Sequence, residues 1–366
     1  MRVLIVDDSS VMRLLLHAVL SHEGYEVREA ESGEQALQIL TGYTPDIVTM
    51  DLHMPGINGF ETIERILEKY ALPVVILTAS ANASEAATAM RALAVGALAV
   101  LEKPSGPEAA DFDERIAALL RTLRSMAQVK IVRRPRKAAT AAVQPGAEAP
   151  ARPGPGNGAS LIETVALERP QLIAIAASAG GPAALKALLQ GLDPLPPWPL
   201  VLVQHIAQGF LPSFRSWLGG LSPLPVAIAE VGQSLAPGVL YLAPDGLHLL
   251  FSSSRRVQLQ PCAAQETLCP SANQLFRSVA RQFARQAIGI QLSGMGRDGA
   301  DGLLELRRAG GLTLAQEPAS AMIDSMPQAA IDLGAVRQSL PPEGIAVLLN
   351  AIAAHVNAQA RHGGRT

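Results

Sequence analysis

The chain has 366 residues, of which 49% are hydrophobic, and its 30 basic and 32 acidic residues give a formal net charge of −2. This length suits about two globular domains, and the near-neutral charge gives no basis for nucleic acid or an anionic membrane as the main partner. No apolar run approaches the roughly 20 residues of a membrane helix, and the opening MRVLIVDD meets two acids where a secretory signal would stay apolar, so we expect a cytoplasmic protein without membrane insertion.

Up to residue 126 the sequence alternates short aliphatic runs with segments of helical period. The aliphatic runs are VLIVDD, YEVREA, DIVTMD, VVILTA and ALAVLEKP. Continuous apolar strands joined by helical crossovers form parallel sheets that are covered by helices on both faces. The pattern therefore predicts five strand–helix units in one doubly wound parallel sheet.

Polar residues end four of these aliphatic runs: Asp7-Asp8, Asp51, Thr78 and Lys103. Ligands of open parallel sheets bind beyond the carboxyl ends of the strands, so we expect these side chains to share one pocket. Three converging carboxylates repel each other unless a cation lies among them, and oxygen ligands of high charge suit Mg²⁺. A lysine and a threonine would complete a site for a phosphoryl group carried by one of the acids.

Around these residues the sequence resembles the receiver domains of two-component response regulators, over roughly residues 1–124. The most specific part is the Asp-x-x-Met-Pro-x-x-x-Gly spacing that runs from Asp51 to Gly59. The resemblance implies a flavodoxin-like fold in which Asp51 accepts a phosphoryl group from a histidine kinase of the chemotaxis type. Val100 departs from the family, which usually has Phe or Tyr there.

The resemblance also assigns the other residues of the pocket. It implies that Asp7 and Asp8 bind Mg²⁺ together with Asp51, and that Thr78 and Lys103 sense the phosphoryl group. With no aromatic side chain at position 100, switching would rely more on the Thr78 hydroxyl. We interpret His53, in the loop after Asp51, as a surface residue rather than a metal ligand.

Residues 125–168 read as a flexible linker. Seven basic residues and no acid lie between positions 121 and 137, and Ala, Pro and Gly make up 17 of the 26 residues from 135 to 160. Such a segment has no spaced large apolar residues from which to build a core. The basic stretch is either a solvated helix end or a contact for an acidic partner.

After the linker the alternation of strand-like and helical segments returns. The strand-like runs are LIAIAAS, PLVLVQH, AIGIQLSG and LTLAQE. Between residues 226 and 261, turn signals recur every eight to ten residues, which predicts antiparallel hairpins, and PEGIAVLLNAIAAHV predicts a closing helix. The expected fold class is α/β, with two doubly wound parallel-sheet domains, the second Rossmann-like with an added antiparallel hairpin.

Three residues of this second half have the chemistry of a hydrolytic triad. Ser178 follows LIAIAA, His205 follows LVLVQ, and Asp298 lies in the Gly-rich turn after AIGIQLSG. They supply a nucleophile, a base and an orienting acid. Asp301 is an alternative orienting acid, although it fits better in the first turn of the next helix.

The segment after Ser178 reads Ala-Gly-Gly-Pro and then a helix, whose first backbone N–H groups offer oxyanion donors. The Gly-Gly pair would let a substrate approach the backbone closely. The two Gly-rich turns would also suit phosphate binding, but neither matches the GxGxxG or P-loop pattern.

At these motifs, residues 169–358 resemble the catalytic domain of the CheB family of chemotaxis protein-glutamate methylesterases. The resemblance rests on IAASAGGPAAL, VQH, LYLAPDGLH, PSANQLFRSVA, LSGMGRDGA and AQEPASAMIDSMPQAA. It implies Ser178 as nucleophile, His205 as general base and Asp298 as its orienter. Ala179 and Met295 would supply the oxyanion donors. Ala179 departs from the Thr or Ser that is frequent in the family, and Asn273 departs from an Asp.

The activity that the resemblance implies is phosphorylation-activated hydrolysis of glutamate γ-methyl esters on methyl-accepting chemotaxis receptors, with deamidation of receptor glutamines as a second reaction of the family. The esterase would need no cofactor. The alternative is a non-catalytic response regulator whose second domain only binds a partner, and such a module has no reason to keep the triad side chains within hydrogen-bond reach. A DNA-binding output is disfavoured because no basic helix-turn-helix segment follows the linker.

The expected organisation is a receiver domain at 1–124, a linker at 125–168, a catalytic domain at 169–358 and a tail at 359–366. The only cysteines, Cys262 and Cys269, are separated by six residues. That spacing matches neither a CxxC redox pair nor a zinc-ligand pattern, so we expect two inert thiols.

Overall fold

The computed structural model describes residues 1–79, 83–129, 131, 169–192, 196–263, 265–266 and 268–363. Most of the predicted linker, from residue 132 to residue 168, therefore lies outside the described residues. No helix in the described ranges combines the length and the apolar character needed to cross a membrane.

The N-terminal half forms one parallel sheet covered by helices. Its elements are β1 (Arg2–Val6), α1 (Ser10–His22), β2 (Glu26–Ala30), α2 (Gly33–Ile39), β3 (Ile47–Asp51), α3 (Gly59–Lys69), β4 (Val74–Thr78), α4 (Ala83–Val95), β5 (Ala99–Glu102) and α5 (Phe112–Met126). The strand order β2-β1-β3-β4-β5, with parallel pairing, confirms the predicted doubly wound sheet. Alternate residues of β1 pack on opposite faces, with Val3 and Ile5 in one apolar cluster and Leu4 and Val6 in another.

The C-terminal half is a larger domain of the same kind. Its elements are β6 (Leu172–Ala177), α7 (Gly181–Gln190), β7 (Leu200–Gln204), α8 (Leu211–Leu221), β8 (Val226–Ile228), β9 (Leu240–Leu242), β10 (Leu247–Phe251), β11 (Val257–Pro261), α9 (Ala272–Phe283), the 3₁₀ turn η1 (Ala284–Gln286), β12 (Ala287–Gln291), α10 (Ala300–Arg308), β13 (Leu312–Gln316), the 3₁₀ turn η2 (Pro318–Ser320), α11 (Ser325–Asp332), β14 (Gln338–Leu340) and α12 (Pro342–Gly363). Seven strands form a parallel sheet in the order β14-β13-β12-β6-β7-β9-β8.

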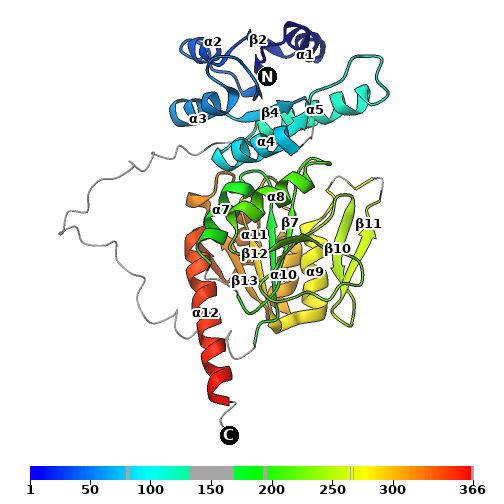
Figure 1. The fold of residues 1–366 in the computed structure, drawn as a ribbon, viewed down its shortest axis with the longest axis vertical. Coiled ribbons are helices and arrows are strands. Elements are labelled where there is room, and N and C mark those ends of the chain that lie inside the picture. Colours follow the sequence, from blue (N-terminus) through cyan, green and yellow to red (C-terminus); the bar gives the residue numbers. More distant parts are fainter. Residues whose placement is uncertain are drawn as a thin grey trace, which may run out of the picture.

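The segment 226–261 contains one hairpin rather than several. Strands β10 and β11 pair antiparallel as a separate two-stranded sheet, at the right of Figure 1, whereas β8 and β9 join the large sheet in parallel. The connection between β8 and β9, residues 229–239, is much longer than a hairpin turn, and parallel neighbours require such a crossover. Turn signals by themselves could not distinguish these two connections.

Strand β6 lies near the middle of the large sheet and is buried along its whole length. Ile173 and Ile175 belong to the apolar cluster that also holds Leu185 of α7 and Leu218 of α8. Their neighbours Leu172, Ala174 and Ala176 belong to the cluster on the other face, with residues of α9 and α10. Burial on both faces explains why LIAIAA reads as a continuous apolar run.

The two domains pack against each other through α4, which contacts α7 and α8 (Figure 1). One apolar cluster continues from Ala89 and Leu93 of α4 to Leu185 and Leu211 in the second domain. A smaller cluster joins Leu98, just before β5, to loops at the top of the second domain. The face formed by α4, β5 and α5 therefore covers the carboxyl ends of the second sheet.

The cysteines form a disulfide, so the expectation of two inert thiols was wrong. Cys262 and Cys269 lie on either side of a loop between β11 and α9, and their Cα atoms are 6.1 Å apart. This separation lies in the usual range for a disulfide. The loop turns back on itself, and sequence spacing alone does not reveal such a turn.

Two element boundaries differ from the expected domain limits. Helix α5 ends at Met126, two residues beyond the expected end of the first domain, and α12 continues to Gly363, into the expected tail. The residues of this tail up to 362 contain neither Gly nor Pro, so nothing in them stops the helix earlier.

Candidate functional site

The acidic residues predicted to share a pocket in the first domain do lie together. Lys103 Nζ is 2.8 Å from Oδ2 of Asp7 and 2.8 Å from Oδ2 of Asp51, so one ammonium joins the ends of β1, β3 and β5. The carboxylates of Asp7, Asp8 and Asp51 lie within 4.8 Å of one another. Thr78 ends the neighbouring strand β4 and is fully buried.

The charges of this pocket are not balanced. Burial raises the pKa of Asp7; the hydrogen bond and charge of Lys103 oppose this shift, and the charge of Asp51 adds to it. Burial by itself would lower the pKa of Lys103, but its hydrogen bonds to Asp51 and Asp7 and their charges outweigh this, so the pKa is raised overall. One ammonium among three carboxylates leaves excess negative charge, and hard oxygen donors of this kind fit a Mg²⁺ ion.

The loop after Asp51 explains the glycine of the receiver motif. A Cβ atom at Gly59 would lie 2.0 Å from the carbonyl oxygen of Asp51, which no side chain can tolerate. His53 is exposed, and its backbone N–H donates to Oδ1 of Asp51 over 3.2 Å. The residue thus contributes its backbone to the pocket, in agreement with its interpretation as a surface side chain.

In the second domain, the predicted triad residues follow three adjacent strands. Ser178 follows β6, His205 follows β7, and Asp298 lies in the loop after β12. Nε2 of His205 is 3.1 Å from Oδ2 of Asp298. Ser178 is 9% exposed, and it lines the same cavity of about 220 Å³ as His205. Within the described residues, the Ser178 hydroxyl makes no hydrogen bond to His205.

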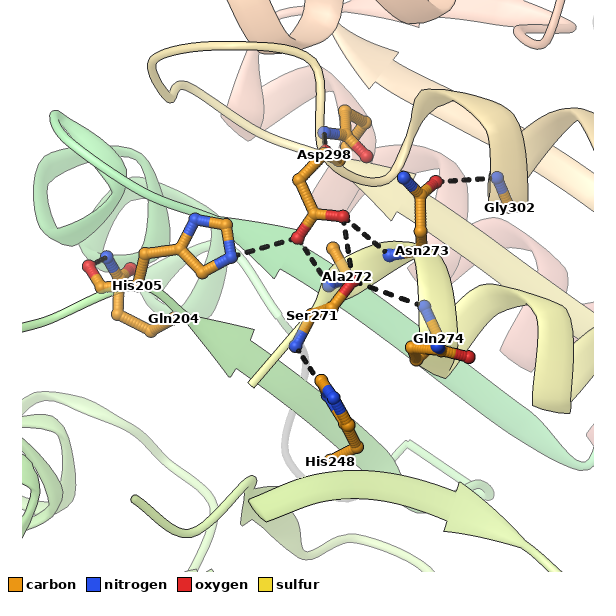
Figure 2. Close-up of polar contacts among 10 residues, drawn as sticks. Gln204, His205, His248, Ser271, Ala272, Asn273, Gln274, Asp298 and Gly302 are labelled. Carbon is orange, nitrogen blue, oxygen red and sulfur yellow. Dashed lines mark hydrogen bonds and ion pairs between the residues drawn. The ribbon is translucent and has the colours of Figure 1, made fainter. Parts of the chain in front are cut away.

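Asp298 is held by four hydrogen bonds, two to each carboxylate oxygen (Figure 2). Oδ2 accepts from His205 Nε2 and from the backbone N–H of Ala272 at 2.7 Å. Oδ1 accepts from the Ser271 hydroxyl at 2.9 Å and from the backbone N–H of Asn273 at 3.0 Å. The carboxylate thus takes up N–H groups that the first turn of α9 leaves without helical partners.

These bonds determine the ionisation of Asp298. Burial by itself would raise its pKa, but the hydrogen bond and charge of His205 and the backbone donors of Asn273 and Ala272 lower the pKa below its ordinary value. Asp298 is therefore an ionised acid with no vacant acceptor position. Asp301 instead pairs with Arg297 at 3.1 Å in the first turn of α10, so Asp298 is the acid that contacts His205.

Sequence reasoning missed several residues that shape this site. Gln204 is buried, and its Nε2 donates to the carbonyl oxygens of both Ser178 and His205 over 2.9 Å. Ser271 is the N-cap of α9, a role that a serine before a helix often has, and nothing in its sequence context reveals the bond to Asp298. Asn273, where the family often has Asp, uses its side-chain oxygen to accept from the N–H of Gly302 at 2.8 Å.

The glycines near Ser178 serve internal packing. Gly180 has a φ of 75°, and a Cβ at Gly181 would lie 2.6 Å from Oε1 of Gln204. A Cβ at Gly294 would lie 2.7 Å from Cβ of Ser178. The tight turn and the neighbouring loops account for these glycines, so a close approach of substrate is not needed to explain the Gly-Gly pair.

The cavity beside Ser178 and His205 has one wall from the other domain. Leu98, just before β5, Val100 of β5 and Met126 of α5 line the same cavity as the two predicted catalytic residues. Leu98 also packs with Ala179, and Met295 contacts the same cluster. The two predicted oxyanion donors therefore lie directly under the first domain.

The fold and the two sites define a class of protein, a receiver-type domain packed on a second α/β domain that carries a serine beside a His–Asp pair. Residues 3–111 match the family model of the response regulator receiver domain, and residues 173–349 match that of the CheB methylesterase. Both resemblances noted in the sequence are confirmed.

Relatives match along nearly the whole chain. The chain is 46% identical to protein-glutamate methylesterase/protein-glutamine glutaminase 3 of Hahella chejuensis, over 96% of this chain and 98% of that protein. It is 39% identical to protein-glutamate methylesterase/protein-glutamine glutaminase 1 of Syntrophus aciditrophicus, over 97% and 99%. Among solved structures it is similar to the Thermotoga maritima CheB methylesterase catalytic domain, at 29% identity over 50% of this chain and 97% of that chain, with a TM-score of 0.47. The chain belongs to the protein-glutamate methylesterase/protein-glutamine glutaminase family.

Proposed function

We propose that this protein hydrolyses glutamate γ-methyl esters on methyl-accepting chemotaxis receptors, and that phosphorylation of Asp51 controls the reaction. The observation that carries the esterase assignment is the His205–Asp298 pair beside Ser178 at the ends of three adjacent strands. Membership of the family supports the substrate class. The same chemistry extends to deamidation of receptor glutamines, with ammonia in place of methanol as the leaving group.

In the proposed mechanism, Ser178 Oγ attacks the ester carbonyl carbon while His205 accepts the serine proton. Because Nε2 of His205 donates to Asp298, Nδ1 is the nitrogen left to accept that proton. The tetrahedral oxyanion would be stabilised by the backbone N–H groups of Ala179 and Met295. Collapse expels methanol, which takes the proton from His205, and a water molecule activated by His205 then hydrolyses the acyl-enzyme to glutamate.

Asp51 would accept the phosphoryl group from a histidine kinase. Asp7, Asp8 and Asp51 would hold a Mg²⁺ ion, which when bound offsets the charge of the incoming phosphoryl group. Lys103, now bonded to both Asp7 and Asp51, would pair with the new phosphoryl oxygens, and the Thr78 hydroxyl would sense them. Val100 is only 2% exposed and provides no aromatic side chain for this response.

The packing of the two domains supports regulation by occlusion. Leu98 is 3% exposed and packs on Ala179, next to the serine that a receptor segment must reach. Phosphorylation would shift the equilibrium between docked and undocked receiver domain, and undocking of the face formed by α4, β5 and α5 would uncover the cavity beside Ser178 and His205. A charge at position 98 should weaken the apolar contact, so Leu98→Asp should raise the activity measured without a phosphodonor.

The decisive test is hydrolysis of methylated receptor by the full-length protein, with and without a small-molecule phosphodonor and Mg²⁺. Ser178→Ala should reduce methanol release by about 10⁴-fold or more, because only binding and electrostatic catalysis remain. Near-normal turnover by this variant would refute the triad. A non-catalytic partner-binding module would release no methanol even from the wild-type chain.

A further inference from the structure

Behind the triad, a second histidine continues the hydrogen-bond network. His248, at the start of β10, is 2% exposed. Its Nδ1 lies 3.1 Å from the backbone nitrogen of Ser271, and its Nε2 lies 2.9 Å from Oε2 of Glu266. Figure 2 shows His248 beneath Ser271, on the side of that residue away from His205.

The donors and acceptors in this network have only one consistent assignment. A backbone N–H can only donate, so Nδ1 of His248 accepts from Ser271 and the ring proton of a neutral imidazole must be on Nε2. Nε2 then donates to Glu266, whose carboxylate has its pKa lowered by this bond and by the N–H of Ala263. The ring orientation and the tautomer of His248 are therefore both determined.

Ser271 links His248 to Asp298 by hydrogen bonds on both sides. Its hydroxyl has a single proton, which it donates to Oδ1 of Asp298, while its oxygen accepts from the N–H of Gln274. Its N–H is held by His248 at the same time. Because the neighbouring N–H groups of Ala272 and Asn273 also bind Asp298, a shift of Ser271 would move three of the four donors of that carboxylate.

Cys262 and Cys269 lie close enough to His248 to suggest a metal site, but the network argues against one. The Nδ1 lone pair is engaged by Ser271 and Nε2 carries a proton, so neither nitrogen of the ring is free to bind a metal. The sulfurs bond to each other and close the loop that contains Glu266. The disulfide thus restricts the residue that orients His248.

We propose that His248, oriented by Glu266, is a positioning residue of the esterase, which through Ser271 holds Asp298 in line with His205. This inference rests on the proposed function for its substrate. It accounts for a buried histidine that contacts none of the triad side chains in the described structure. Loss of the alignment should slow the chemical step and leave receptor binding unchanged.

Three substitutions at one position test the proposal in the full-length protein, activated by a phosphodonor with Mg²⁺. His248→Phe keeps a ring but removes both bonds, and should lower kcat for methanol release about 10- to 100-fold, with KM within about twofold. His248→Asn places a side-chain oxygen near the position of Nδ1 and should retain most of kcat. His248→Gln reaches toward Glu266 without an acceptor for Ser271 and should behave like His248→Phe.

A spectroscopic measurement gives a readout that does not depend on the substrate. The proton between His205 Nε2 and Asp298 should give a low-field ¹H NMR resonance, which should persist in His248→Asn and shift or broaden in His248→Gln. His17→Phe is the matched control, because His17 pairs with Glu29 at 2.6 Å in the receiver, far from the triad, and it should change neither readout.

The outcomes separate the two proposals. Equal impairment of the Asn and Gln variants would mean that only packing matters and would overturn the positioning role, as would a raised KM with unchanged kcat. Stoichiometric zinc bound at His248 would also overturn it. Normal turnover by Ser178→Ala would instead refute the proposed function, while the NMR comparison of the Asn and Gln variants would still judge His248. If His248→Phe does not fold, that same comparison decides.

Discussion

The two candidate sites both lie at the carboxyl ends of the strands of a parallel sheet, yet their carboxylates differ in hydrogen bonding and in the direction of their pKa shifts. In the receiver, three carboxylates lie close together and the Lys103 ammonium pairs with two of them, Asp7 and Asp51, while burial raises the pKa of Asp7. In the catalytic domain, Asp298 has two donors on each oxygen and a lowered pKa. A pocket with excess negative charge can respond to an added ion or phosphoryl group, whereas an ionised carboxylate with all four acceptor positions hydrogen-bonded is suited to hold one orientation.

The largest effect on activity is expected at Asp298, the carboxylate with four hydrogen bonds. Asp298→Asn should reduce phosphodonor-activated methanol release by about 10³- to 10⁴-fold, because an amide favours the wrong His205 tautomer and cannot stabilise the imidazolium. Steady-state kinetics on methylated receptor would measure the loss. Asp301→Asn is the matched control and should retain nearly full activity, since among the described residues Asp301 pairs with Arg297 and not with His205. A comparable loss in both variants would contradict the assignment of the orienting acid.

At the receiver pocket the expected effect is on regulation rather than on chemistry. Asp51→Asn should abolish the stimulation by a phosphodonor with Mg²⁺ and leave the basal rate within about twofold, because the triad is not part of this pocket. The ratio of methanol release with and without the phosphodonor measures this stimulation. Persistent stimulation of the variant would show that Asp51 is not the acceptor.

The two carboxylates should also titrate on opposite sides of the ordinary aspartate pKa, near 4. Asp7 has a raised pKa in the folded state, so its contribution to stability is present at low pH and is lost as the pH rises through the window above about 4. Asp298 has a lowered pKa, so its contribution is present above about 4 and is lost as the pH falls below that value.

Carboxyl ¹³C NMR titrations would resolve both groups. Mg²⁺ should move the Asp7 titration to lower pH and leave Asp298 unchanged. If Asp7 titrated below Asp298 in the absence of Mg²⁺, the contrast between the two pockets would be wrong.

The smallest effect concerns the disulfide between Cys262 and Cys269. Replacing Cys262 and Cys269 together by Ser should lower the free energy of unfolding of the oxidised protein by about 2 kcal/mol, the chain-entropy estimate for so short a loop. Both tryptophans, Trp198 and Trp217, lie in the catalytic domain, so denaturant unfolding followed by tryptophan fluorescence reports on this domain. Under reducing conditions the two proteins should unfold alike.

Much of the molecule was determined by local sequence pattern. The period of the apolar residues separates strands from helices, and runs such as LIAIAA indicate burial on both faces of a sheet. Because parallel strands align their carboxyl ends, the sequence alone assigns Asp7, Asp51 and Lys103 to one pocket, and Ser178, His205 and Asp298 to another.

Other features depended on contacts between distant segments. Local sequence does not predict three of these contacts. They are the parallel pairing of β8 with β9, the disulfide between Cys262 and Cys269, and the hydrogen-bond network from Glu266 through His248 to Asp298. A serine before a helix reads only as a cap, and a histidine in a strand reads only as a core residue, because hydrogen bonds between elements leave no periodic signal. The alternation of apolar residues determined the sheets and the edge at which the chemistry lies, whereas tertiary packing decided which donors hold Asp298 and that the receiver covers Ser178.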